Sequence, residues 1–401
     1  MNGIRRLLTY LTITTTSLVV ILDGTVVTVA LPSIRSDLGF TESGLSWVAN
    51  SFFVAFALVL LPAGRLGDRY GARRVFLPGL ALFTLASLWC GLAGDPASLL
   101  LARAVQGIGG GASTAVTLSM VARLYPEEEL RSRAFAGLAF VGSAGASVGL
   151  VAGGALVEAL SWRWAFLVNV PIGVVAAVAA ARLLEHTPGV ALRGGLVPRA
   201  LFADRRFGLA NGILFTMVMA GMSFQFLTSL YLQDTLGLSA LATGTGFLAT
   251  SGAIAVASLG VSGRLAQRTG TVRTLQVGLL LFVVGMLLMV RLPDNGSYVA
   301  DVMVPLVVMG AGFGLAMPQV TQLAMSTAPA AYASAASGFV NTVQQAGGAI
   351  GLFAVAGAAA ATERGVGYLL AAIGLVAGIV LTTLLQRGRS AAPAPSAAAA
   401  S

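Results

Sequence analysis

Twelve long apolar stretches follow one another along this chain of 401 residues, with short polar connections between them. One helical crossing of a bilayer needs about 20 apolar residues, which is close to the length of each stretch. Only 10% of the residues are charged, whereas a soluble domain carries roughly 25%. The sequence therefore predicts an all-α polytopic membrane protein and argues against a soluble enzyme. The stretches cover approximately residues 8–32, 44–64, 75–94, 98–122, 134–158, 164–184, 207–232, 241–262, 273–291, 299–322, 335–359 and 366–386.

The basic residues are all Arg, 24 in number, and they account for the net charge of +9. Twelve crossings place both termini on the same side of the membrane. If that side is the cytoplasm, it holds 19 Arg residues and the outer side holds four, with Arg103 inside the membrane. Because cytoplasmic loops carry the excess of basic residues, we expect both termini in the cytoplasm. No folded basic domain is left to bind nucleic acid.

Other kinds of chemistry find little support in the sequence. Cys90 is the only Cys and His186 the only His, which excludes a disulfide framework and a Cys/His metal site. No phosphate-binding Gly-x-x-x-x-Gly-Lys-Ser/Thr loop is present. We therefore expect no enzymatic activity, no metal and no cofactor. The basic N-terminus resembles a signal peptide, but its apolar stretch is too long and contains Asp23, so we interpret it as the retained first crossing.

The longest internal polar stretch, 185–206, divides the crossings into six and six. We expect an N-terminal bundle over 1–184, a cytoplasmic link over 185–206 and a C-terminal bundle over 207–389. The last segment, 390–401, contains only Ala, Pro and Ser, and this composition predicts a disordered tail.

The two halves repeat a loop motif. Gly64–Arg74 follows the second crossing and Gly263–Arg273 follows the eighth, with an offset of 199 residues. Both copies therefore occupy the same loop of their half. Two halves in the same orientation imply a pseudo-two-fold axis along the membrane normal, with a central cavity between two six-helix bundles.

The first copy resembles the cytoplasmic loop signature of the major facilitator superfamily, Gly-x-x-x-Asp-Arg-x-Gly-x-Arg-Arg. The resemblance covers nearly the whole chain and implies the fold of that family. We also expect a conformational latch here, because Asp68 can make charge-assisted hydrogen bonds to the neighbouring Arg69, Arg73 and Arg74 at the cytoplasmic rim. Such a latch would hold the outward-open state and break on inward opening. An anchor that only fixes topology is the alternative, and it is the reading we prefer for the second copy, where Gln267 replaces the acid. The residues matching the signature are Gly64, Asp68, Arg69, Gly71, Arg73 and Arg74.

Further motifs resemble the drug:proton antiporters of the fourteen-helix branch. Asp23 lies in a stretch similar to the helix-one signature of that branch, and Arg103, Gln106 and Gly107 match its Arg-x-x-Gln-Gly. Only a short link occupies the place of the branch's additional central helix pair, so the chain resembles a twelve-helix member. The fifth crossing matches the antiporter motif at Gly145, Gly149, Gly153 and Gly154, but Leu150 stands where Pro is expected.

Asp23 and Arg103 are the main candidates for proton coupling, because ionisable residues inside a membrane are costly and usually functional. Asp23 lies roughly 13 Å and Arg103 roughly 8 Å from the outer ends of their helices, at 1.5 Å per residue. The two side chains could therefore meet in the cavity. We expect protonation of Asp23 to release Arg103 and favour one access state. The alternatives are a static ion pair, or an Asp23 that only hydrates the outer vestibule.

Uncharged amides are the candidates for a substrate path. Asn341, Gln344 and Gln345 share one face of the eleventh crossing. Hydrogen bonds between helices are the alternative role for each amide. A cavity with few charges suits amphipathic or lipophilic organic molecules better than sugars or phosphates. The full candidate set is Gln106, Asn211, Gln225, Gln319, Gln322, Asn341, Gln344 and Gln345.

The leading hypothesis is proton-coupled export of a small organic compound by a monomer in a bacterial plasma (inner) membrane. Its expected partners are that substrate, protons and the lipid bilayer. One alternative keeps the fold and makes the protein an uptake symporter or a facilitator. A second alternative is a transport-inactive membrane sensor or assembly partner.

Overall fold

The computed structural model describes residues 3–186, 189, 195–238, 240–293, 296–361 and 364–390. Within these ranges the chain is helical and contains no strand. The first half comprises α1 (Gly3–Leu38), α2 (Glu42–Tyr70), α3 (Ala72–Leu92), α4 (Pro96–Leu124), α5 (Glu128–Ala159), α6 (Trp164–Leu167) and α7 (Asn169–Leu183).

The second half follows a short 3-10 helix, η1 (Arg199–Phe202). It comprises α8 (Arg205–Leu230), η2 (Tyr231–Thr235), α9 (Ala240–Gly246), α10 (Leu248–Ala255), η3 (Val256–Ser262), α11 (Gly263–Thr269), α12 (Thr271–Met289), η4 (Tyr298–Val302), α13 (Met303–Thr327), η5 (Ala330–Tyr332), α14 (Ala333–Ala361) and α15 (Arg364–Ser390).

These elements form the twelve crossings that the sequence predicts, with α6 and α7 making the sixth and α9 to α11 making the eighth. Nine helical segments of the described ranges are long and apolar enough to cross a membrane, and the Gly- and Ala-rich helices α4, α5 and α14 complete the set. Most helices continue past the expected ends. The tail expected to be disordered was 390–401, but Ser390 is the last residue of α15, and residues 391–401 lie outside the described residues.

Local signals explain several helix starts. The side chain of Asp95 accepts a hydrogen bond from the Ser98 amide, and Pro96 occupies the first turn of α4. Such caps satisfy amide groups that have no partner within the helix. Thr41 caps α2 in the same way. Between α2 and α3 a single residue, Gly71, makes the turn with φ of 95°, a conformation that favours glycine.

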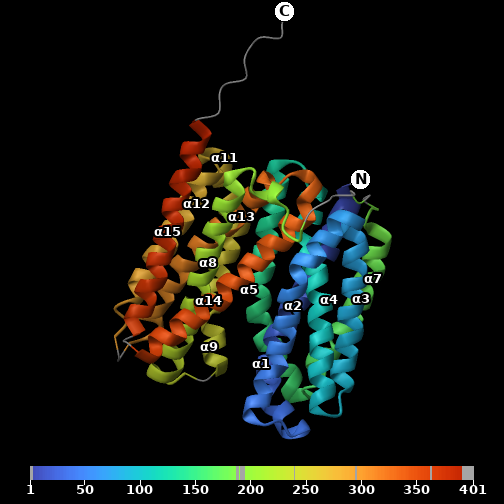
Figure 1. Ribbon diagram of the computed structural model, residues 1–401. Helices are drawn as coiled ribbons and strands as arrows, with labels where there is room; N and C mark the ends of the chain where they lie inside the picture. The colour runs from blue at the N-terminus through green and yellow to red at the C-terminus, as the bar shows by residue number, and fades with distance from the viewer. Residues whose placement is uncertain are drawn as a thin grey trace, which may run out of the picture.

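The helices form two bundles. In Figure 1, α1 to α7, coloured blue to green, lie on one side, and the yellow to red helices of the second half lie on the other. The start of α1 and the end of α15 lie at the same end of the molecule, here called the terminal face (Figure 1). Between the bundles, α14 packs against α2 and α4, and α13 and α10 pack against α5. The second crossing thus contacts the eleventh, and the eighth contacts the fifth, so each half makes the same kind of contact with the other. This is the pseudo-two-fold arrangement that the repeated loop predicts.

The outer surface of the bundles is apolar. Leu58, Val175 and Val256 each expose about two thirds or more of their side chains, at 71%, 70% and 68%. Exposed apolar patches of this kind would be a liability in water, but they suit contact with lipid chains. The protein is thus a multi-pass membrane protein whose polar side chains are kept for the interior and the two ends.

Candidate functional site

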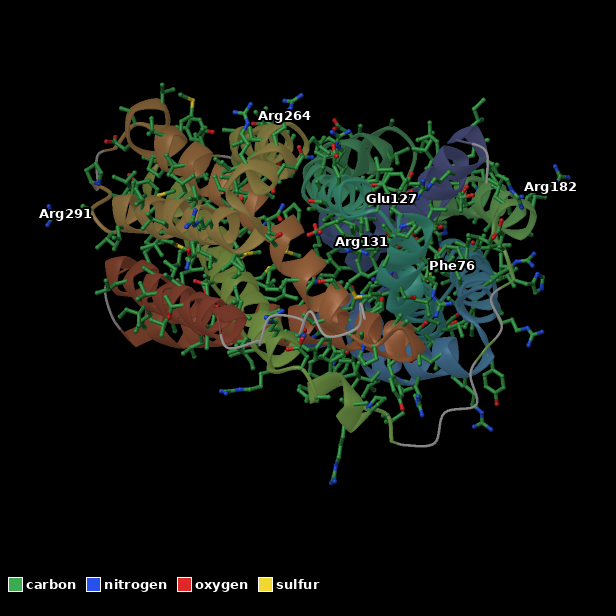
Figure 2. All side chains as sticks on the ribbon, turned by 90° about the horizontal axis from the view of Figure 1, so that it is seen from above. Phe76, Glu127, Arg131, Arg182, Arg264 and Arg291 are labelled. Atoms are coloured by element: carbon green, nitrogen blue, oxygen red, sulfur yellow. The ribbon has the colours of Figure 1, made fainter. Side chains whose placement is uncertain are left out.

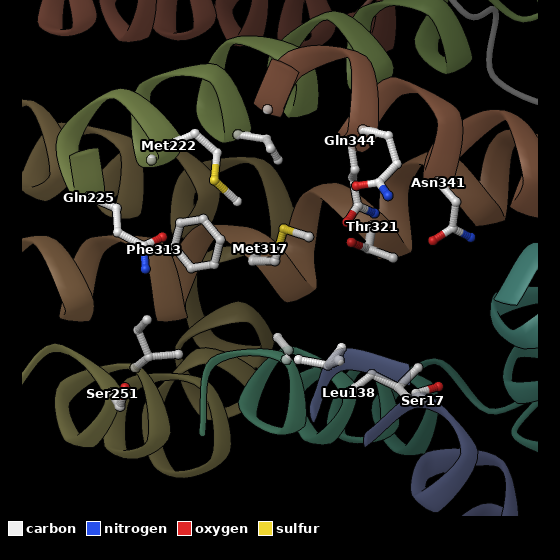
Figure 3. Close-up of a pocket in the computed structure, with 18 of the residues that line it drawn as sticks. Ser17, Leu138, Met222, Gln225, Ser251, Phe313, Met317, Thr321, Asn341 and Gln344 are labelled. Atoms are coloured by element: carbon white, nitrogen blue, oxygen red, sulfur yellow. The ribbon is translucent and has the colours of Figure 1, made fainter. Parts of the chain in front are cut away.

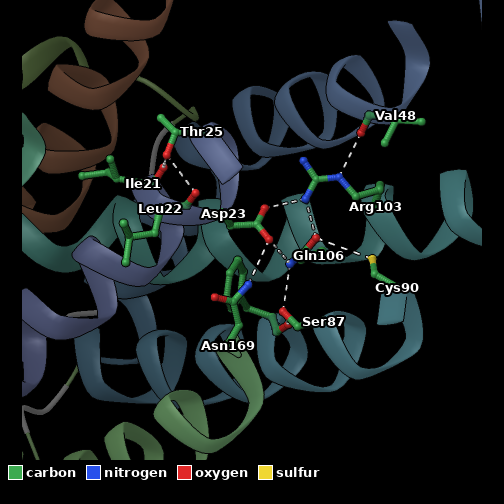
Figure 4. A network of polar contacts seen from close by, with 11 residues as sticks. Ile21, Leu22, Asp23, Thr25, Val48, Ser87, Cys90, Arg103, Gln106 and Asn169 are labelled. Atoms are coloured by element: carbon green, nitrogen blue, oxygen red, sulfur yellow. Dashed lines mark hydrogen bonds and ion pairs between the residues drawn. The ribbon is translucent and has the colours of Figure 1, made fainter. Parts of the chain in front are cut away.

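A buried ion pair joins α1 to α4 inside the first bundle. Arg103 Nη1 lies 2.5 Å from Asp23 Oδ2, and neither side chain has any exposed surface. Figure 4 shows the two side chains pointing toward one another between their helices. The helical rise predicted a similar depth in the membrane for the two residues, and the structure places their side chains in direct contact.

Further polar groups complete the surroundings of Asp23. Its Oδ1 accepts hydrogen bonds from Gln106 Nε2 at 2.8 Å and from Asn169 Nδ2 at 3.0 Å. Gln106 also donates to Ser87 Oγ at 2.8 Å, so α1, α3, α4 and α7 all contribute to this network (Figure 4). A buried carboxylate is tolerated when it is paired and hydrogen-bonded in this way.

Arg103 also makes several contacts besides the ion pair. Its Nε donates to the Val48 carbonyl at 2.9 Å and its Nη1 also donates to Gln106 Oε1 at 2.6 Å. The guanidinium carbon lies 4.4 Å from the centroid of the Phe52 ring, in cation–π geometry. The second terminal nitrogen, Nη2, is buried and has no hydrogen-bond partner in the described part of the chain. Arg103 therefore keeps one donor unused in this state.

A cavity of about 480 Å³ lies between the two bundles. Gln225, Asn341, Gln344 and Gln345 contribute polar groups from α8 and α14, and Figure 3 shows Gln344 and Asn341 close to Thr321 of α13. Among the described residues that line the cavity, none carries a charge. The apolar lining comes from both halves and includes Ile21, Leu118, Phe135, Leu138, Val218, Met222, Phe224, Phe247, Ile254, Phe282, Met309, Phe313 and Met317.

Four of the eight candidate amides lie away from this cavity. Gln106 belongs to the ion-pair network, and Asn211 donates to the Phe207 carbonyl of its own helix at 2.8 Å. Gln319 and Gln322 contact α5 instead. Asp23 and Arg103 are likewise absent from the lining, so the ion pair does not face the cavity as we expected. A residue's depth follows from its position along the helix, but the direction of its side chain depends on how neighbouring helices pack.

Gln319 and Gln322 join the bundles near the terminal face. Gln319 Nε2 donates to Ser262 Oγ at 2.9 Å and to Ser132 Oγ at 3.3 Å. Gln322 Nε2 donates to Glu128 Oε1 at 3.2 Å. Ser132 and Glu128 belong to α5, whereas both Gln residues belong to α13. These amides therefore make a contact between the halves, which is the alternative role that the sequence left open.

Asp68 makes the second contact between the halves. Its Oδ1 accepts the Ser334 amide at 2.7 Å and its Oδ2 accepts the Ala335 amide at 2.9 Å. A carboxylate at the start of a helix satisfies free amide groups and complements the helix dipole. Asp68 is only 3% exposed. The end of α2 thus binds the start of α14 from the other bundle.

Glycines allow these two helices to approach closely. A Cβ placed on Gly64 would lie 2.6 Å from the Ser334 carbonyl oxygen, and one on Gly67 would lie 2.8 Å from Ser334 Cβ. Real side chains do not tolerate such distances. Gly64 therefore lets the backbone of α2 approach that of α14, and Gly67 leaves room for the Ser334 side chain.

The Arg residues of the first loop have other partners. We expected Asp68 to bond to them, but no ion pair among the described residues joins it to Arg69, Arg73 or Arg74. Arg73 Nη2 donates to the Ala181 carbonyl at 2.6 Å, and Arg69 lies over the ring of Tyr70. Arg74 is exposed. The acid instead uses backbone groups of the opposite bundle, which sequence patterns do not reveal.

The second copy of the loop has the same backbone turn as the first copy, but it does not make the same close contact between the bundles. Gly270 has φ of 92°, close to that of Gly71. A Cβ on Gly263 would meet only Arg133 Cγ, at 3.9 Å. Gln267 is exposed. This loose packing supports our interpretation of the second copy as an anchor.

The glycines of the fifth crossing lie along α1. A Cβ on Gly149 would lie 2.0 Å from Thr25 Oγ1, and Cβ atoms on Gly145 and Gly153 would meet Leu18 and Val26 at 2.9 and 2.8 Å. This glycine face therefore lets α5 lie tightly along α1, close to Asp23. Gly154 and Leu150 belong to α5, but their surroundings lie outside the described part of the chain.

Sequence reasoning missed several residues of these sites. It did not assign Asn169 or Ser87 to the ion-pair network. It also missed Ser132 and Ser334 because small polar residues carry no distinctive pattern. Their roles follow only from the packing of one bundle against the other.

Two bundles of membrane helices around an uncharged cavity, held together at one end, define a solute carrier. A sequence profile of the Major Facilitator Superfamily matches residues 13–352. The chain belongs to the Major Facilitator Superfamily, whose members named below are transporters and exporters and not enzymes.

Relatives with known names include antibiotic exporters. The puromycin resistance protein pur8 of Streptomyces alboniger is 35% identical over 395 residues, which covers 84% of this chain and 78% of that protein. The cephamycin export protein CmcT of Amycolatopsis lactamdurans is also 35% identical, covering 84% of this chain and 82% of that protein. The chain is therefore a transporter related to drug and antibiotic exporters.

Solved structures show the same fold at lower identity. The human organic anion transporter MFSD10 (TETRAN) superposes with a TM-score of 0.78 at 17% identity, covering 94% of this chain and 99% of that one. The transporter FucP in its outward conformation gives a TM-score of 0.74 at 15% identity, covering 95% and 99%.

Proposed function

We propose that this transporter exports small amphipathic or lipophilic organic compounds in exchange for protons by alternating access. The single observation that carries the proposal is the placement of α1. One face of this helix contributes Ser17 and Ile21 to the cavity, and another face holds Asp23 against Arg103. A change at the ion pair therefore reaches the cavity through one rigid helix.

The cavity favours an uncharged ring-containing substrate. Its lining combines Phe and Met side chains with four amides and carries no charge. Met side chains adapt to different shapes, and a few amides fix orientation by hydrogen bonds. A permanently charged substrate would lose its hydration there without gaining a counterion, which is costly. The names of the relatives, which include puromycin resistance and cephamycin export, agree with organic substrates.

Proton coupling would use the same ion pair in two states. Charged Asp23 binds Arg103, as in this structure. A proton on Asp23 would remove the charge that holds Arg103 and would free the guanidinium to rearrange. Arg103 Nη2 has no hydrogen-bond partner among the residues that the structure describes, so another acceptor could complete its hydrogen bonds in the second state.

The contacts between the halves favour a state closed at the terminal face. Asp68 with α14 and the Gln319 and Gln322 contacts with α5 all lie on that side of the cavity. The Arg distribution supports a cytoplasmic terminal face and a location in a bacterial plasma membrane. With link 185–206 joining bundles 1–184 and 207–389, the two bundles would rock about the cavity as these contacts break.

Everted membrane vesicles with a panel of aromatic antibiotics test the proposal. Export predicts accumulation inside the vesicles that collapses when the proton gradient is abolished, and an Asp23→Asn variant should accumulate no substrate above equilibrium. Loss of substrate from preloaded vesicles would indicate an uptake symporter. A purified wild-type protein without flux in proteoliposomes for any compound would indicate a sensor or assembly role.

A further inference from the structure

A second cavity lies inside the first bundle at the terminal face. It has a volume of about 400 Å³ and lies between the start of α1, the start of α3, the end of α4 and the end of α7. It shares no lining residue with the cavity between the bundles. Its size falls within the range of small-molecule sites, roughly 300–1,000 Å³. The transport mechanism proposed above makes no use of it.

Three Arg side chains line this cavity. They are Arg6, Arg73 and Arg123, and Glu185 is the single acidic residue among the described residues of the lining. The lining therefore has an excess of positive charge. In the view down onto the terminal face in Figure 2, the labelled Arg182, which is not part of the lining, lies at the edge of the same bundle.

The hydrogen bonds of these Arg residues are incomplete. Arg73 donates to the Ala181 carbonyl, but its Nε is buried with no hydrogen-bond partner. Arg123 makes no hydrogen bond or ion pair among the described residues. Arg6 binds the Leu124 carbonyl and Glu127, and Nη1 of Arg73 also contacts the imidazole ring of His186. An anion in the cavity would give the unused donors an acceptor.

The rest of the lining is mainly apolar, with Ile13, Met120, Leu183 and Leu184 among its members. A site with guanidinium groups and an apolar wall, at one end of a membrane bundle, suits an amphipathic anion. Basic pockets between membrane helices bind anionic lipid head groups in this way. We propose that this cavity binds the phosphate head group of an anionic phospholipid, with the start of its acyl chains against the apolar wall.

Binding of short-chain phosphatidylglycerol to the purified full-length protein tests this assignment. Phosphatidylcholine of the same chain length and inorganic phosphate serve as the two comparison ligands. We expect selective binding of phosphatidylglycerol and a loss of about tenfold in affinity in Arg123→Gln, because one charge-assisted hydrogen bond is worth that much. Arg182→Gln removes the same charge from the same face outside the cavity and should leave the affinity unchanged.

Three results would overturn the assignment. Equal weakening by Arg182→Gln would mean that the lipid senses only the general charge of the face. Equal binding of phosphatidylcholine would remove the selectivity for an anion. Inorganic phosphate bound as tightly as phosphatidylglycerol would make the cavity a soluble-anion site.

The test does not depend on a single variant. If Arg123→Gln fails to fold, native mass spectrometry of the wild-type protein decides, since selective retention of phosphatidylglycerol over phosphatidylcholine is required. Because every readout is binding, a failure of the proposed export leaves this inference standing, and the reverse also holds.

Discussion

Ile21 and Asp23 lie two residues apart on α1 and serve different sites. Ile21 lines the cavity between the bundles, whereas Asp23 binds Arg103 inside the first bundle. Two residues of an α-helix point about 200° apart, at 3.6 residues per turn. The helix therefore separates the buried ion pair from the cavity, so that in the proposed mechanism substrate and proton need not touch in order to be coupled.

Removal of the charge on Asp23 should destabilise the protein strongly. In Asp23→Asn the side chain keeps its shape, but buried Arg103 loses its counterion. Breaking a buried pair by changing one partner costs about 3–5 kcal/mol. We expect a clear fall in the thermal unfolding midpoint in detergent.

The double variant Asp23→Asn with Arg103→Gln provides the control. It removes both charges and should recover part of the lost stability, because no unpaired charge remains buried. A double variant less stable than the sum of the two single variants would contradict the assignment of an ion pair.

Gly64→Ala should disrupt closure at the terminal face. The new Cβ would lie 2.6 Å from the Ser334 carbonyl, and overpacking of this kind costs about 1–3 kcal/mol. Thiol labelling of Ser119→Cys in a Cys90→Ala background reports opening, because Ser119 lies 3.3 Å from Ser334 across the interface. Labelling should become roughly tenfold faster or more, given the size of that cost.

Gly263→Ala is the matched control in the second loop, where the nearest atom would be 3.9 Å away. It should leave the labelling rate of Ser119→Cys unchanged. If Gly64→Ala and Gly263→Ala changed the labelling rate of Ser119→Cys to the same extent, the first loop would be no more than a topology anchor.

Gln344→Leu should weaken substrate binding with little effect on stability. Gln344 lines the cavity, and a hydrogen bond to a neutral partner contributes about 0.5–1.5 kcal/mol. The KM for transport should rise roughly two- to tenfold on this scale. Asn211→Leu, at a buried position outside the lining, should change the unfolding midpoint and not KM. A KM unaffected by Gln344→Leu would place the substrate elsewhere.

The end of the first bundle opposite the terminal face should lose stability in acid. Hydrogen bonds from Trp162 and Arg163 lower the pKa of Asp37 below its ordinary value. The unfolded chain therefore binds a proton at Asp37 more readily than the folded chain does. As a result, the contribution of the Asp37 carboxylate to the free energy of unfolding is complete at neutral pH. It is lost as the pH falls through about 3.9, the ordinary value for Asp, and below.

Unfolding midpoints measured from pH 6 to pH 3 check this prediction. Asp37→Asn should have a shallower decline in acid than the wild type, and Trp162→Phe should lie between them because one hydrogen bond remains. Superimposable profiles for Asp37→Asn and the wild type would contradict it.

The sequence predicted the crossings and the meeting of Asp23 with Arg103, because hydropathy and helical rise depend on position along the chain alone. It failed to separate Gln344, which lines the cavity, from Gln319, which joins the bundles. Both are amides in apolar helices, and only the rotation of each helix against its neighbours distinguishes them. The partners of Asp68 could not be predicted either, because they are the backbone amides of Ser334 and Ala335, and every residue type except Pro has such an amide.

Proton movement driven by substrate tests the central claim most directly. Wild-type protein is reconstituted in proteoliposomes with a pH-sensitive dye inside, and a transported compound is added on one side without an initial pH gradient. The account predicts that protons move opposite to the substrate, and that Asp23→Asn still exchanges labelled for unlabelled substrate while moving no protons. Proton movement of wild-type size in folded Asp23→Asn would contradict it.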